Sequence, residues 1–151
     1  MLNPFFRIVL VISLSTSFCC AAPPAVRGYF VSPDGNDNND GRSVETPWKT
    51  LEKVNASKFK PGDTIRFEGG RIFESNVLQY QSALLISDSG TPDSPIVYTS
   101  YGGMRATIKA DSIGVMCSGK EFVEFHSINV SGSFNPFDQR DAIAFNNIGL
   151  W

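Results

Sequence analysis

Short apolar runs recur along this chain, separated by Gly, Asn, Asp and Ser. Isoleucines in these runs are spaced by 21, 22, 20 and 20 residues: Ile65, Ile86, Ile108, Ile128 and Ile148. Similarity at a fixed period of this length is typical of solenoids, in which each repeat stacks on the one before. The runs are short, β-branched and bounded by turn residues, which predicts strands. We therefore expect one isoleucine per coil, with the isoleucines lying above one another.

One amphipathic helix is expected ahead of the first coil. Thr46 suits its N-cap and Pro47 its first position, and it should end near Asn55. Its apolar residues fall on one side at spacings of three: Trp48, Leu51 and Val54. Because an open solenoid end exposes apolar side chains and unpaired strand edges, this helix face is predicted to cover that end.

The remaining pattern shows only strands and turns. Expected strands are 29–31, 64–67, 77–78, 84–86, 96–98, 107–108, 114–116, 123–125, 128–130 and 142–145. The lack of a second helix pattern argues against a βαβ protein. The expected fold is all-β, a parallel β-helix (β-solenoid) of about four to five coils with one N-terminal capping helix and an uncapped C-terminal end. A small β-sandwich would explain neither the helix nor the even spacing.

The first residues read as a secretory signal peptide, with cleavage expected after Ala21. Arg7 precedes the apolar stretch 8–12, and small residues follow near position 21. A membrane anchor is the alternative, but the stretch is short and broken by serines. Acylation at Cys19 or Cys20 is disfavoured by the bulky Phe18. A secreted, extracellular protein is expected, divided into 1–21 (signal peptide), 22–63 (N-terminal strand, Asx-rich loop and capping helix) and 64–151 (incomplete β-helix coils).

Cleavage would leave Cys117 as the one cysteine, so packing and not a disulfide must hold the domain. We expect Cys117 to be a small core residue of a buried strand. The whole chain carries 13 basic and 15 acidic residues; without Arg7 the balance is 12 to 15, a net charge of −3. No basic block appears, which excludes nucleic-acid binding through phosphate neutralisation. Polysaccharide binding would need a local basic groove.

The stretch from Ser32 to Gly41 is composed almost entirely of turn residues. Its spacing matches the first half of an EF-hand loop at Asn36, Asn38, Asp40 and Gly41. The closing bidentate Glu would fall at Pro47, so the EF-hand interpretation fails and Asx turns are expected instead. No cofactor or metal site is predicted for this chain.

Three blocks of the chain resemble secreted right-handed parallel β-helix proteins of the pectate-lyase-like superfamily. They are YFVSPDGND with DG and TPWKTL (29–51), PGDTIRF (61–67), and SGT with SPIVY and SYG (89–102). The resemblance implies a right-handed winding and kinship with polysaccharide lyases and glycoside hydrolases. Such proteins are usually much longer, with active sites on the outer face of central coils. The chain is therefore expected to be an inactive N-terminal fragment; a non-catalytic adhesion or structural solenoid is the alternative.

In lyases of the superfamily that this chain resembles, calcium held by Asp and Glu neutralises the carboxylate of a uronate while a Lys or Arg removes a proton. Glu124 and His126 share one side of their strand by alternation, and Glu124 is expected near residues 141–144, one coil later. Asp138, Arg140 and Asp141 cluster in one loop. Each has a plain interpretation as a solvated residue, and no grouped aspartates appear. The catalytic residues are unknown from sequence, and none is named.

Two N-glycosylation sequons begin at Asn55 and Asn129. They matter only in a host that glycosylates secreted proteins. Asn55, at the expected helix end, is predicted to be the more accessible of the two, because Asn129 lies in a predicted strand.

Overall fold

The computed structural model describes residues 27–75, 82–111, 113–132 and 143–146. The expected signal peptide, the strand at 77–78, the loop around Arg140 and the last isoleucine, Ile148, lie outside these ranges.

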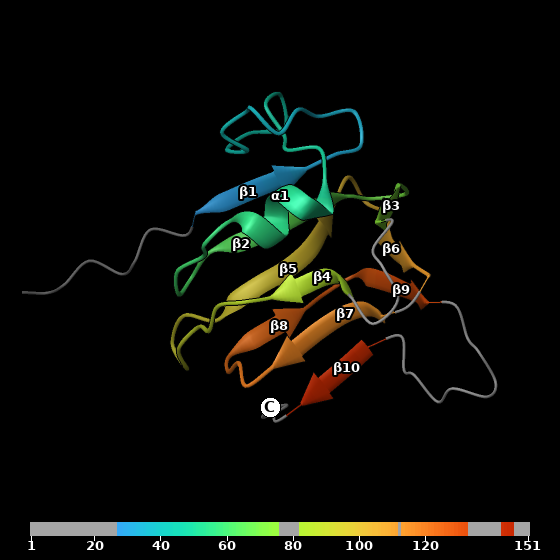
Figure 1. Ribbon diagram of the computed structural model, residues 1–151. Coiled ribbons are helices and arrows are strands. Elements are labelled where there is room, and N and C mark those ends of the chain that lie inside the picture. Colours follow the sequence, from blue (N-terminus) through green and yellow to red (C-terminus); the bar gives the residue numbers. More distant parts are fainter. Residues whose placement is uncertain (1–26, 76–81, 112, 133–142, 147–151) are drawn as a thin grey trace, which may run out of the picture.

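Strands of the described residues pass in turn through three parallel sheets (Figure 1). From β2 onward, each strand pairs in parallel with the strand three places later in the chain. The first sheet contains β1 (Gly28–Val31), β2 (Thr64–Glu68), β5 (Ile96–Tyr101) and β8 (Val123–Phe125). The second contains β3 (Ile72–Ser75), β6 (Ala106–Ala110) and β9 (Ile128–Gly132), and the third β4 (Ser82–Ile86), β7 (Ile113–Ser118) and β10 (Ile143–Asn146). The mainly β, parallel architecture expected from the sequence is confirmed.

The predicted column of isoleucines is wrong. Ile65 lies in the first sheet, Ile86 in the third, and Ile108 and Ile128 in the second. Even within the second sheet, Ile108 pairs with Val130. Paired residues are instead 22 to 36 positions apart, as in Ala106 with Ile128 and Gly28 with Thr64. All three sheets have strands with inward-facing branched residues. The isoleucines about 20 residues apart are therefore residues of different sheets and not equivalent residues of successive coils.

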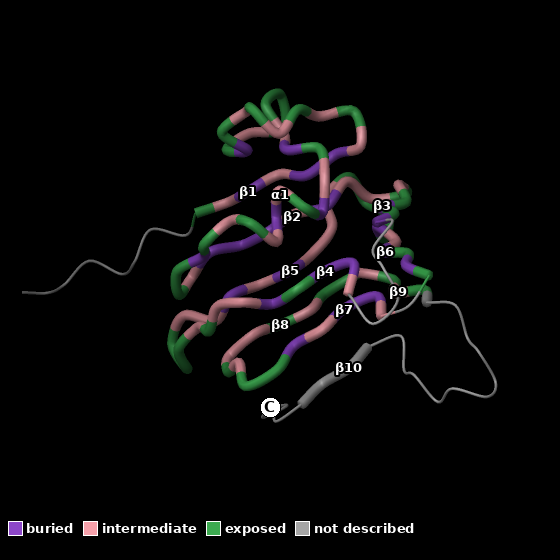
Figure 2. The backbone as a smooth tube through the Cα atoms, in the orientation of Figure 1, coloured by how far each residue is buried: buried purple, intermediate pink, exposed green. Residues whose placement is uncertain are grey.

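The core lies between the three sheets and is formed by columns of mixed residues. In the first sheet, Tyr29, Ile65, Tyr98 and Phe125 occupy one row by register. The rings of Tyr98 and Phe125 stack with centroids 5.2 Å apart. Buried and exposed positions alternate along many of these strands, as Figure 2 shows. This alternation directs one set of side chains inward and leaves the other set on the outer faces.

The helix α1 spans Leu51–Ala56 and is shorter than predicted. Its N-cap is Thr50, whose hydroxyl accepts a hydrogen bond from the Lys53 N–H, and not Thr46. Trp48 lies before the helix in extended backbone that forms a parallel bridge with Val31. At Trp48, backbone pairing with β1 therefore replaces helix formation, and α1 begins three residues later, at Leu51. Trp48, Leu51 and Val54 are nevertheless all buried, as their spacing predicted.

The helix packs against β4 and β3, the terminal strands of the third and second sheets. Glu52 accepts a hydrogen bond from the buried Ser75 hydroxyl of β3. Asn55 donates to the Ala83 carbonyl and accepts from the Leu85 N–H, both at 2.9 Å. The expectation that Asn55 is the more accessible sequon is thus wrong. Its amide is bound to β4, whereas Asn129 is exposed.

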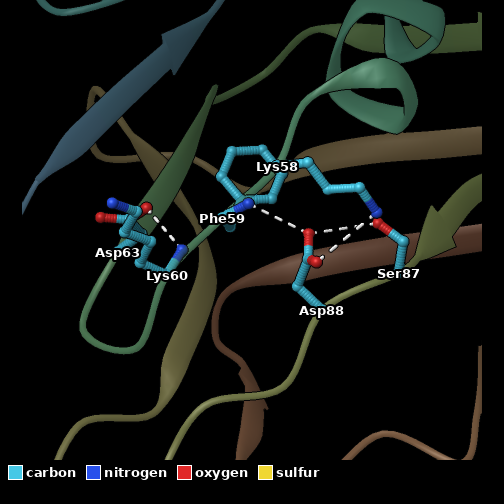
Figure 3. A network of polar contacts seen from close by, with 6 residues as sticks. All are labelled: Lys58, Phe59, Lys60, Asp63, Ser87 and Asp88. Atoms are coloured by element: carbon cyan, nitrogen blue, oxygen red, sulfur yellow. Dashed lines mark hydrogen bonds and ion pairs between the residues drawn. The ribbon is translucent and has the colours of Figure 1, made fainter.

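Two carboxylates fix the segment between α1 and β2 (Figure 3). Asp88 accepts hydrogen bonds from the Phe59 N–H and the Ser87 hydroxyl and lies 3.6 Å from Lys58 Nζ. Asp63 accepts from the Lys60 N–H at 2.8 Å. The type II turn predicted at 60–63 is confirmed by the positive φ of Gly62 and by the hydrogen bond from Asp63 N–H to the Lys60 carbonyl.

Cys117 is fully buried on β7, as predicted, and makes no disulfide among the described residues. Burial raises the pKa of its thiol, which keeps it protonated.

In the part of the chain that the structure describes, none of the helices has the length and apolar character needed to cross a membrane.

Candidate functional site

Glu124 and His126 lie on the outer face of the first sheet, on the same side of β8 as predicted. The Glu124 carboxylate is 2.8 Å from His126 Nε2, and both side chains are exposed. The expected proximity of Glu124 to residues 141–144 is wrong for the described positions. Ala144 belongs to β10, which pairs with β7 in the third sheet, whereas β8 pairs with β5. Asp138, Arg140 and Asp141 are not among the described residues.

The same outer face carries aromatic, cationic and carboxylate side chains in neighbouring rows. The register aligns Phe30 with Arg66 and Thr99, and Glu68 with Tyr101. Outward orientation follows from alternation, since the intervening residues of these strands are buried. We call this set the first-sheet outer face; its residues are Phe30, Arg66, Glu68, Thr99, Tyr101, Glu124 and His126.

Two half-buried aromatic rings form the apolar part of this face. The Phe30 and Tyr101 rings meet edge to face, with centroids 5.4 Å apart and an interplanar angle of 82°. Arg66 Cζ lies 5.5 Å from the Phe30 ring centroid. Burial, and then the negative charge of Glu68, raises the pKa of the Tyr101 hydroxyl. The phenol therefore stays protonated at neutral pH and offers an O–H donor beside the rings.

Both carboxylates of this face already have partners. Glu68 accepts a hydrogen bond from the Ser32 hydroxyl, and Glu124 contacts His126. Register places Glu124 beside Val97 and Val97 beside Thr64, four residues before Glu68. Two strand spacings and four residues of rise put the Cα atoms of Glu68 and Glu124 about 16 Å apart. In glycosidases the two carboxyl groups themselves are about 5 to 9.5 Å apart. The Glu68 carboxylate is bound to Ser32 beside β1, on the side of β2 away from β8, and the Glu124 carboxylate is bound to His126, so the two do not form an acid and base pair.

A second polar group lies on the outer face of the second sheet. Lys109 Nζ is 2.8 Å from Glu74, and both line a cavity of about 50 Å³ with Asp111. The hydrogen bond to Glu74, the charge of Glu74 and that of Asp111 raise the pKa of Lys109. A proton-abstracting lysine needs a lowered pKa, so Lys109 is not suited to this role. The sequence reasoning missed Glu74 because the adjacent apolar pair Ile72 and Phe73 hid the alternation of β3.

A larger cavity of about 230 Å³ lies beside this group. It is lined by residues of the Asx-rich loop, of the segment just before α1, of α1 and of β3: Pro33, Lys49, Thr50, Leu51, Ile72, Phe73 and Glu74. Lys49 and Ile72 are exposed here, and Glu74 lines both cavities. This surface has no aromatic platform apart from Phe73, which is buried in the core.

Acceptors of the Asx-rich loop (residues 32–41) bind N–H groups in or near the loop and in the segment before α1. Asn36 accepts from the Asn38 N–H and Asp40 from the Arg42 N–H, which are the predicted Asx turns. Asp37 accepts from the Lys49 and Thr50 N–H groups and from the Thr50 hydroxyl. Within the described ranges, no three His, Cys, Asp or Glu side chains are grouped so that they could hold a metal ion.

The chain is similar to parts of several carbohydrate-active enzymes. No family model matches the sequence. The chain is 38% identical over 76 residues to a lacto-N-biosidase of Bifidobacterium longum subsp. longum, an alignment that covers 49% of this chain and 4% of that protein.

Solved structures share the fold at low sequence identity. GH136 lacto-N-biosidase from Eubacterium ramulus superposes with a TM-score of 0.58 at 24% identity, over 72% of this chain and 21% of that one. Pectate lyase Pel9A gives 0.56 at 20% identity, over 81% and 32%. A rhamnogalacturonan lyase gives 0.53 at 18% identity, over 68% and 28%. This chain thus spans a small part of each relative, and these likenesses show the β-helix fold alone.

Proposed function

We propose that this chain is the N-terminal part of a secreted β-helix protein of carbohydrate metabolism, and that its first-sheet outer face binds a glycan. The observation that carries the proposal is the grouping of Phe30, Tyr101 and Arg66 on one exposed sheet face. Aromatic rings pack against the apolar faces of sugar rings, while charged and hydroxyl groups beside them bind sugar oxygens. The shared fold with three carbohydrate-active enzymes supports this interpretation.

We propose further that the described residues bind glycan without cleaving it. Glu68 is bound to Ser32 beside β1 and Glu124 to His126 on β8, so the two carboxylates do not form the pair that glycoside hydrolysis needs. The raised pKa of Lys109 opposes proton abstraction. Any lyase or hydrolase chemistry of the whole protein would then belong to residues outside the described ranges.

The N-terminal elements have a structural part in this proposal. The Asx-rich loop and the segment between it and α1 pair with β1 through Gly41 and Trp48, and α1 covers the terminal strands β3 and β4. We propose that together they close one end of a right-handed coil stack, so that further coils extend only from β8, β9 and β10. Closing the end would protect unpaired backbone N–H and C=O groups at the strand edges, which could otherwise pair with strands of other chains.

The test is a binding measurement on the whole chain with three immobilised glycans: a lacto-N-bioside, rhamnogalacturonan and pectate. We expect at least one to bind, and Tyr101→Ala to weaken that binding about fivefold, as loss of an aromatic contact would. Ile72→Ala, an exposed residue of the second sheet, is the matched control and should leave the affinity unchanged.

A turnover assay on the same glycans completes the test. No reducing or unsaturated ends should be released. Release of either kind of end would overturn the proposal that the described residues do not cleave glycan. If none of the three glycans binds, the binding part of the proposal is overturned.

A further inference from the structure

We propose that Arg66 binds a carboxylate, so that the glycan taken by the first-sheet outer face is acidic and contains uronate. This inference rests on the proposed function and names the substrate class of the same face. It decides between the neutral and acidic glycans that carbohydrate-active proteins of this fold could take.

Arg66 has no ion pair with either carboxylate of this face, Glu68 or Glu124. Glu68 is engaged by Ser32, and Glu124 by His126. The other Lys and Arg ion pairs among the described residues engage Arg27, Lys58, Arg71 and Lys109. Arg66 has no carboxylate within ion-pair distance in this part of the chain. A planar guanidinium in this state is suited to the bidentate recognition of a carboxylate.

The surroundings of Arg66 hold its side chain in place. The guanidinium lies against the Phe30 ring and passes over Gly28, where a Cβ atom would overlap it. Gly28 lies two residues before Phe30 on the same side of β1, so the missing side chain makes the space that Arg66 occupies. A cation positioned in advance loses less conformational entropy when it binds.

The neighbouring rings fix which part of the ligand meets Arg66. Phe30 contacts both the Arg66 guanidinium and the Tyr101 ring, so apolar and cationic surface adjoin directly. A uronate residue combines a ring face with a carboxylate and matches both features. The chain as a whole is net negative, with 13 basic and 15 acidic residues. Long-range attraction therefore does not explain a preference for acidic glycans, and the local contact must provide it.

The experiment compares two forms of one ligand, an oligogalacturonide with free carboxylates and the same oligosaccharide fully methyl-esterified. Binding to the whole chain is measured by calorimetry at fixed salt concentration. We expect the free acid to bind about tenfold more tightly, the worth of one charge-assisted contact. Arg66→Gln should remove this preference, and Gly28→Ala should reduce it by displacing the guanidinium while keeping its charge.

Lys49→Gln is the matched control, because it removes an exposed cation beside the second sheet and should keep the preference. Circular dichroism establishes that each variant is folded. Equal binding of both ligand forms, with loss of both in Tyr101→Ala, would overturn the role of Arg66 and leave the glycan-binding face intact. A preference that persists in Arg66→Gln would likewise overturn it. Binding of neither form would overturn this inference, whereas the proposed function fails only if the lacto-N-bioside and rhamnogalacturonan also do not bind.

Discussion

At the scale of single residues, one side chain takes the place of a neighbouring strand. Asn55 donates to the Ala83 carbonyl and accepts from the Leu85 N–H, the two backbone groups that flank Leu84. A residue of an adjacent parallel strand would bond to the same pair of groups. The edge of β4 is thus partly satisfied by an amide from α1, which reduces its tendency to pair with another chain.

Asn55→Ala should therefore destabilise the fold. Both β4 backbone groups lose their partner, and the free energy of unfolding should fall by about 1 to 3 kcal/mol. Asn55→Asp keeps the acceptor for Leu85 but loses the donor to Ala83, so its effect should also be destabilising. Urea denaturation measures the change, and Asn129→Ala, at an exposed position of β9, is the control. Equal stability of Asn55→Ala and Asn129→Ala would show that the amide contributes nothing.

At the scale of elements, the Asx-rich loop and α1 are joined through Asp37. Its carboxylate binds the Lys49 and Thr50 N–H groups and the Thr50 hydroxyl, and Thr50 in turn caps α1. Burial alone would raise the pKa of Asp37, but these hydrogen bonds, with the nearby Lys53 charge, outweigh it and lower the pKa below its ordinary value of 3.8. The folded state therefore favours the ionised form of the Asp37 carboxyl group more than the unfolded state does.

This shift predicts how stability depends on pH. Because the folded pKa lies below the unfolded one, ionised Asp37 stabilises the fold above about pH 4, and the contribution is lost as the pH falls through the folded pKa. Asp37→Asn should cost about 1 kcal/mol near pH 6, and its difference from the unmodified chain should shrink toward pH 3. Thermal unfolding across this range measures the effect. Asp93→Asn, at an exposed turn position, should show little difference at any pH, and a constant difference for Asp37→Asn would contradict the prediction.

The elements also show what the sequence could predict and what it could not. Alternation in runs such as Thr64–Phe67 identified most strands, and the pattern Lys60–Asp63 identified its turn, because both signals are local. The helix start was misplaced because Trp48 satisfies its backbone by pairing with β1, a contact that depends on tertiary structure. The length of a coil was also predicted wrongly. The number of residues per coil depends on turns of unequal length, which the spacing of isoleucines does not reveal.

The sequence predicted only the part of the candidate site whose residues belong to a single strand. Glu124 and His126 were placed on one side of β8 correctly, by alternation alone. The grouping of Phe30, Arg66 and Tyr101 depends on the register of three strands far apart in the sequence. The sequence predicted the strands but not which of them become neighbours.

At the scale of the whole molecule, the two ends of the stack are built differently. At one end, the outer edge of β1 is paired with the loop, through the bonds from Phe30 N–H to the Gly41 carbonyl and from Ser32 N–H to the Trp48 carbonyl. At the other end, β8 and β9 each pair with a strand on one side only among the described residues. Their apolar side chains are correspondingly only partly buried: Val123, Phe125, Ile128 and Val130.

This asymmetry predicts that the stack opens from one end. Strands β2, β5, β6 and β7 have a partner strand on both sides, so their amides should exchange most slowly with deuterium. The Phe30 and Ser32 amides should also be protected, although β1 is a terminal strand, because the loop pairs with its edge. Amides of β8 and β9 should exchange fastest, since local opening there breaks one set of hydrogen bonds and exposes little apolar surface. Peptide-resolved exchange of the whole chain measures the order, and faster exchange in β1 than in β8 would show that the loop does not close the edge of β1.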